Sequence, residues 1–180
     1  MTGAGLPSRR QANAAGAGAC ALMMAFALYV QHGLGLMPCN LCILQRGAVI
    51  LLGVVFLLTA LHDPGRIGAR VYAALIAIAA SLGVLLSARH VWVQMQPAGS
   101  LPSCGADFYT LLDLLPVQDA IATVLRGGAE CQANLWSLFG LSMPAWLLVA
   151  VAVLGLGGIA ANVRLDRGAA GRAAAASARR

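Results

Sequence analysis

Long apolar stretches separated by short polar segments set the pattern of this chain of 180 residues. Four stretches, at residues 14–33, 43–61, 71–88 and 144–163, are almost free of charge. A helix of about 20 apolar residues crosses the roughly 30 Å hydrocarbon layer of a bilayer. The pattern therefore predicts an all-α membrane protein, a four-transmembrane-helix bundle.

Composition supports the same class. Hydrophobic residues make up 60% of the chain and charged residues only 10%, whereas soluble domains carry about 25% charged residues. The net charge of +6 comes from arginines in the tails and turns rather than from a basic face interleaved with aromatic side chains. We therefore expect a lipid bilayer as the surroundings and no nucleic acid as a partner.

The arginines also predict an orientation. Nine of the 12 lie in the segment 1–13, the turn between the second and third spans, and the segment 164–180. Cytoplasmic segments are rich in arginine and lysine, so both termini are expected in the cytoplasm. The loops 34–42 and 89–143 then face outward. The tail 164–180 is rich in Ala, Gly and Arg with nothing to bury, and we expect it to be disordered.

Five cysteines carry the candidate chemistry. Cys39 and Cys42 lie in the first outer loop, and Cys104 and Cys131 lie in the second. These four thiols are in the compartment where disulfides persist. Cys20 lies within the first span, and we expect it to be a small, buried hydrophobic residue.

The two outer pairs differ in what a disulfide would contribute. Across the short Cys39–Cys42 loop it would stabilise the fold by only about 2 kcal/mol, which favours a redox or metal-binding role. A bridge between Cys104 and Cys131 encloses 26 residues and could contribute about 3–4 kcal/mol. A structural role for that pair stays open, although Cys104 lies in a turn-rich segment that an incoming thiolate could reach.

Arg46 and His90 are the charged or titratable side chains nearest to this chemistry. If the second span begins near Cys42, that sulfur lies at the positive end of the helix, which favours a thiolate. Arg46 is four residues further on the same face. It can stabilise that anion, hydrogen-bond an acceptor's carbonyl oxygen, or extend to lipid phosphates. His90, at the end of the third span, could donate to an acceptor, but its position favours a cation at a helix end.

The second outer loop contains an apolar helical stripe that follows Pro116. It consists of Val117, Ala120, Ile121, Val124 and Leu125. This stripe predicts a short amphipathic helix, which either lies on the membrane surface or packs against the protein.

Together these motifs resemble one known family. They are the Cys39–Cys42 pair with Arg46, the second pair Cys104 and Cys131, and the segment WSLFGLSMPAWLL at 136–148. Over about residues 14–163 the chain is similar to the disulfide bond formation protein B (DsbB) family. Its members are thiol:quinone oxidoreductases of the bacterial inner membrane, with both active loops in the periplasm.

The resemblance implies a mechanism and roles for these residues. A periplasmic DsbA-like thiol oxidase attacks Cys104, and its electrons pass from the Cys104–Cys131 disulfide to the Cys39–Cys42 disulfide. Cys42, beside Arg46, then delivers them to ubiquinone or menaquinone. His90 matches the family's histidine near the quinone, and Gln45 replaces the acidic residue that some members carry. No metal is expected.

Two alternatives remain at this point. A reductase of the vitamin K epoxide reductase type also places such a pair on a small helical bundle. A membrane protein with a four-cysteine zinc site would use both pairs as ligands, although zinc knuckles usually bring each pair at short spacing.

Overall fold

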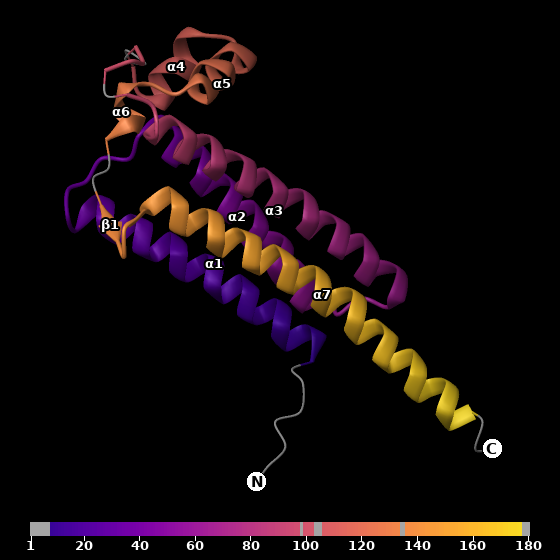
Figure 1. Ribbon diagram of the computed structural model, residues 1–180. Helices are drawn as coiled ribbons and strands as arrows, with labels where there is room; N and C mark the ends of the chain where they lie inside the picture. The colour runs from indigo at the N-terminus through magenta and orange to yellow at the C-terminus, as the bar shows by residue number, and fades with distance from the viewer. Residues whose placement is uncertain (1–7, 98, 103–105, 134–135, 178–180) are drawn as a thin grey trace.

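The computed structural model describes residues 8–97, 99–102, 106–133 and 136–177. Four long helices dominate it: α1 (Arg9–His32), α2 (Asn40–His62), α3 (Arg66–Gln94) and α7 (Met143–Ser177). Contacts run from α1 to α2, from α2 to α3 and from α3 to α7, and α7 closes the bundle against α1 (Figure 1).

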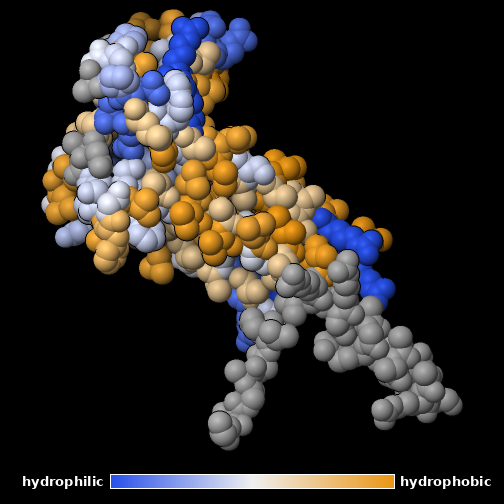
Figure 2. All heavy atoms as spheres, in the orientation of Figure 1, coloured by the Kyte–Doolittle hydropathy of each residue, from blue (hydrophilic) through white to orange (hydrophobic). Residues whose placement is uncertain are grey.

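All four helices are long and apolar enough to cross a membrane, with α7 counted from Met143 to Val163. Figure 2 shows a broad hydrophobic surface along the bundle, with hydrophilic side chains gathered towards its ends. The prediction of a four-span helical bundle is confirmed.

The helix ends depart from the predicted spans. Ser8 caps α1 and forms a capping box with Gln11, so this helix begins five residues before the predicted apolar stretch. Polar residues likewise extend α3 beyond 71–88 at both ends. Beyond Val163, where the composition predicted disorder, α7 continues as far as Ser177. Alanine, abundant in this segment, has the strongest helix propensity.

The core of the bundle is centred on Phe56 of α2, whose side chain is 1% exposed. A Cβ on Gly16 of α1 would lie 2.9 Å from the ring, and one on Gly158 of α7 would lie 2.5 Å from it. Glycine at both positions therefore lets the neighbouring helices close onto the ring. Cys20 is buried in the same cluster, as predicted for a small hydrophobe.

The chain between α3 and α7 covers one end of the bundle (Figure 1). It contains α4 (Phe108–Leu114), α5 (Val117–Arg126), α6 (Ala129–Gln132) and an antiparallel hairpin of β1 (Ser137–Leu138) and β2 (Leu141–Ser142). The predicted amphipathic helix is confirmed as α5. Its Ala120 and Val124 are fully buried and cluster with Leu41 and Val93, so part of the stripe packs against the protein.

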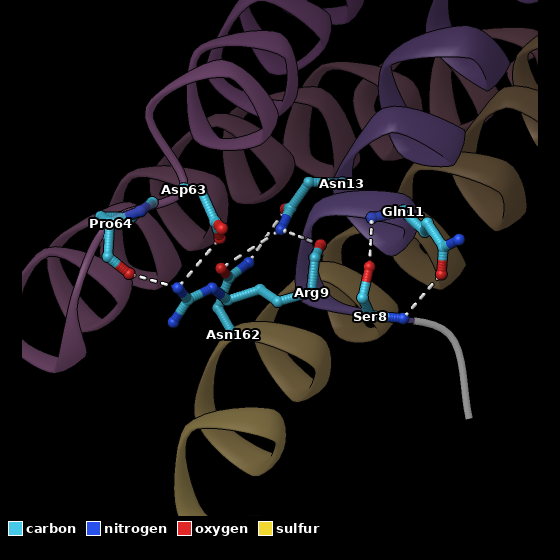
Figure 3. Close-up of polar contacts among 7 residues, drawn as sticks. All are labelled: Ser8, Arg9, Gln11, Asn13, Asp63, Pro64 and Asn162. Carbon is cyan, nitrogen blue, oxygen red and sulfur yellow. Dashed lines mark hydrogen bonds and ion pairs between the residues drawn. The ribbon is translucent and has the colours of Figure 1, made fainter. Parts of the chain in front are cut away.

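A polar clamp joins three elements at the opposite end of the bundle (Figure 3). The side chains of Asn13 in α1 and Asn162 in α7 are buried and hydrogen-bond reciprocally, at 3.3 and 3.0 Å. Arg9 forms an ion pair of 3.1 Å with Asp63 and donates to the Pro64 carbonyl, both in the turn between α2 and α3. The clamp therefore fixes the start of α1, the part of α7 around Asn162 and this turn relative to one another.

We predict that Asn13→Leu lowers the free energy of unfolding by about 1–2 kcal/mol, because it leaves the buried Asn162 amide without one partner. The double variant Asn13→Leu/Asn162→Leu should lose less than the sum of the two single variants. Denaturant unfolding of the four proteins in detergent micelles measures this coupling. Strictly additive losses would show that the two amides do not interact.

Candidate active site

The first cysteine pair lies where α2 begins. Cys39 is the residue that precedes the helix, with an extended backbone (φ −71°, ψ 169°), and Cys42 lies in the first turn. Their sulfur atoms are 3.3 Å apart, in direct contact. Cys39, rather than Cys42, stands at the start of α2. Both sulfurs lie close to the positive end of that helix.

His90 faces this pair from α3. Its Nε2 lies 3.7 Å from the sulfur of Cys39, and its side chain is only 2% exposed. The predicted role as a cation at a helix end is wrong, because α3 continues to Gln94. The imidazole lies instead at the buried contact between α2 and α3.

Gln45 and Ser87 complete a buried chain of hydrogen bonds. His90 Nδ1 lies 3.1 Å from Gln45 Oε1, and Gln45 Nε2 donates to Ser87 Oγ at 3.0 Å. Neither residue has a structural role among the features predicted from the sequence. Their spacing could have indicated a place beside the site. Gln45 follows Cys42 by three residues and Ser87 precedes His90 by three, which places each pair on one helix face.

Cys131 reaches the first pair from α6. A Cβ on Gly127, where φ is +75°, would lie 2.7 Å from Val93, so glycine allows the chain to pass closely over α3 before α6 begins. Arg89 of α3 also holds this connection by donating to the carbonyls of Leu125 and Arg126, each at 2.7 Å.

The thiol of Cys131 is 1% exposed and lies beside Cys39, which packs against the same buried cluster. The interaction with Cys39, and then burial, raises the pKa of Cys131 well above its ordinary value. Cys104 lies outside the described residues, so its bond with Cys131 stays a prediction.

Arg46 connects the site to α1. Its guanidinium donates to the side chain of Gln31 and, at 3.1 Å, to the carbonyl oxygen of Ala27. The arginine is therefore held near the end of α1 instead of extending to lipid phosphates.

A cavity of about 300 Å³ opens beside these groups. Apolar side chains of α1 and α7, among them Met23, Phe26 and Leu147, form much of its wall. Cys39, Cys42, Arg46 and His90 also line the cavity. The structure thus gathers the predicted residues of α2 and α3 at one apolar cavity, and Cys131 joins them through its contact with Cys39.

Comparison with known proteins gives one consistent family. Residues 9–161 match the family described as disulfide bond formation protein DsbB. The disulfide bond formation protein B of Chromohalobacter salexigens is 47% identical over 136 residues, which cover 75% of this chain and 79% of the relative. The protein of the same name from Xanthomonas oryzae pv. oryzae is 44% identical over 150 residues, which cover 83% of this chain and 87% of the relative.

The structure has the features that the names of these relatives imply. Four apolar helices of membrane-spanning length carry a buried cluster of thiols at one end, and the family match extends over the whole bundle. The chain is a multi-pass membrane oxidoreductase of disulfide bond formation, and it belongs to the DsbB family.

Proposed function

We propose that this protein reoxidises a periplasmic DsbA-like thiol oxidase and passes the electrons to ubiquinone or menaquinone in the membrane. The observation that carries the proposal is the position of Cys39. It contacts Cys42, Cys131 and His90 at the wall of an apolar cavity. Its sulfur therefore connects the two outer loops and the membrane interior.

The contact with Cys131 supports direct exchange between the two cysteine pairs. A thiolate of the partner attacks Cys104 of the Cys104–Cys131 disulfide, and Cys131 leaves with the bonding electrons. Cys131 then attacks Cys39 of the Cys39–Cys42 disulfide and releases Cys42 as a thiolate. When the partner departs as a disulfide, Cys104 reforms its bond with Cys131 and returns Cys39 as a thiol.

The cavity fits an apolar ring with a polar edge. Its apolar wall suits a quinone, while Cys42 and Arg46 line the same space. A quinone supplies an acceptor for two electrons and two protons. Arg46, held by Gln31 and Ala27, is placed to hydrogen-bond a carbonyl oxygen and to stabilise Cys42 as a thiolate.

His90 is the proton acceptor that the site offers to Cys39. Because the Gln45 amide nitrogen donates to Ser87, its oxygen faces Nδ1 of His90. Nδ1 must then carry the imidazole proton, which leaves the lone pair of Nε2 directed at Cys39. Transfer of the Cys39 proton to Nε2 would leave a Cys39 thiolate, which can bond to Cys42 again as two electrons pass from the pair to a bound quinone.

The distribution of charge supports an orientation in the bacterial inner membrane. The starts of α1 and α3, which carry Arg9 and Arg66, lie at the end of the bundle away from α4 and α5 (Figure 1). With that end in the cytoplasm, the cysteine cluster faces the periplasm, where a secreted thiol oxidase can reach it.

Membranes supplied with a reduced periplasmic thiol oxidase should reduce quinone when they contain the native protein. We predict that Cys42→Ser and Cys104→Ser abolish this turnover, because each removes a sulfur from the electron path. Cys20→Ser should match the native protein, since Cys20 is buried in the bundle core. Quinone absorbance follows the reaction, and native turnover by Cys42→Ser would refute the route.

We predict that His90 of the reduced protein is protonated on Nδ1 and that Gln45→Leu moves the proton to Nε2. Nitrogen NMR of histidine-labelled protein distinguishes the two tautomers, and His32 and His62 serve as internal references. Gln94→Leu is the matched control, because Gln94 lines the cavity one turn further along α3. A native His90 protonated on Nε2 would contradict the assigned hydrogen-bond chain.

A further inference from the structure

We propose that the reduced form of this protein has a site for one thiophilic divalent cation, Zn²⁺ in particular. Its ligands are the sulfurs of Cys39 and Cys42 and Nε2 of His90. This site is distinct from a four-cysteine zinc site, because it uses a histidine of the membrane bundle and needs neither Cys104 nor Cys131.

The three donor atoms already converge. They lie within 4.8 Å of one another, with 3.3 Å between the two sulfurs and 3.7 Å between Cys39 Sγ and His90 Nε2. Zn–S bonds of about 2.3 Å and Zn–N bonds of about 2.0–2.1 Å in a tetrahedron place ligand atoms about 3.5–3.8 Å apart. Small side-chain adjustments therefore bring these donors to bonding positions around one ion.

His90 also has the support that a metal ligand needs. A ligating histidine usually donates its other ring nitrogen's proton to a fixed acceptor, which sets the tautomer and the ring orientation. Gln45 Oε1 provides that acceptor for Nδ1, and Ser87 in turn holds the amide. The lone pair of Nε2 is thus directed at the dithiol before any ion arrives.

The surroundings suit a dication bound to two thiolates. Binding releases the two thiol protons, and the two negative charges then balance that of the ion. Arg46, which is four residues from Cys42 and hydrogen-bonded to Gln31 and Ala27 of α1, favours the thiolate form of Cys42 that the ion needs. The adjoining cavity of about 300 Å³ leaves room for a water molecule as a fourth ligand, as in zinc sites with three protein ligands.

Binding depends on the redox state, because the Cys39–Cys42 disulfide offers no thiolate ligand. Zn²⁺ would therefore bind only after the pair has been reduced, and it would hold the pair in that state. No electron moves in this step. The expected consequence is that Zn²⁺ inhibits reoxidation of the pair and that removing the ion with a chelator restores it.

The test uses purified full-length protein carrying Cys104→Ser and Cys131→Ser, so that the first pair supplies the only thiols outside the bundle core. After reduction with a phosphine, the protein should bind one equivalent of Zn²⁺. Co²⁺ as a probe should show thiolate-to-cobalt charge-transfer absorption and a tetrahedral visible spectrum. Protein with the Cys39–Cys42 disulfide closed should bind neither ion.

Two further variants separate this site from a simple dithiol. His90→Ala removes a ligand and Gln45→Leu removes its support, so each should weaken Zn²⁺ binding by about 10–100-fold. Cys20→Ser is the control and should bind as the parent does. Unchanged affinity in both His90→Ala and Gln45→Leu, or no binding by the reduced parent, would overturn the proposal. Neither quinone nor partner protein enters the assay, so its outcome is independent of the proposed turnover.

Discussion

The buried hydrogen-bond chain from Ser87 through Gln45 to His90 determines the arrangement of the site, because it ends at the sulfur of Cys39. All three polar side chains are at most 3% exposed. Within a membrane bundle, an unpaired polar group has no water to replace its partner and costs several kcal/mol. Each member therefore restricts the next, and together they fix how α2 and α3 meet at the level of the cysteines.

The rest of the site is assembled around that contact. Gly127 lets the outer loop pass closely over Val93, and the α6 that follows brings Cys131 to Cys39. On the other side, α1 holds Arg46 and supplies much of the apolar cavity wall. The thiol of Cys131, from the outer loop, and the cavity within the membrane segment consequently both adjoin the sulfur of Cys39. That arrangement suits an oxidoreductase whose two reaction partners arrive from different phases.

Much of this architecture is visible in the sequence. The four spans follow from hydrophobic length, and α5 follows from the stripe after Pro116, because both patterns are local. The continuation of α7 beyond Val163 was missed because composition suggested disorder, whereas the alanines there favour a helix. Neither the charge pattern nor the length of the span shows whether disorder or the helix propensity of alanine prevails in this segment.

The connections within the site could not be predicted in the same way. His90 and Gln45 are 45 residues apart, and their contact depends on the rotation of two helices about their axes. From its position alone, His90 was therefore assigned to a helix end, although the family resemblance placed it near the quinone. Gln45 was noted only as a departure from the family pattern. The contact between Cys39 and Cys131 likewise joins two loops, and cysteine spacing alone does not specify it.

The position of Cys39 between Cys42 and Cys131 is the central claim, and disulfide mapping tests it most directly. In a full-length protein carrying Cys42→Ser and Cys104→Ser, mild oxidation should join Cys39 to Cys131 within one chain, and mass spectrometry of the digest should identify the linked peptides. If Cys39 and Cys131 both stay free thiols, or bond only between molecules, the two loops do not meet at this sulfur and the account is contradicted.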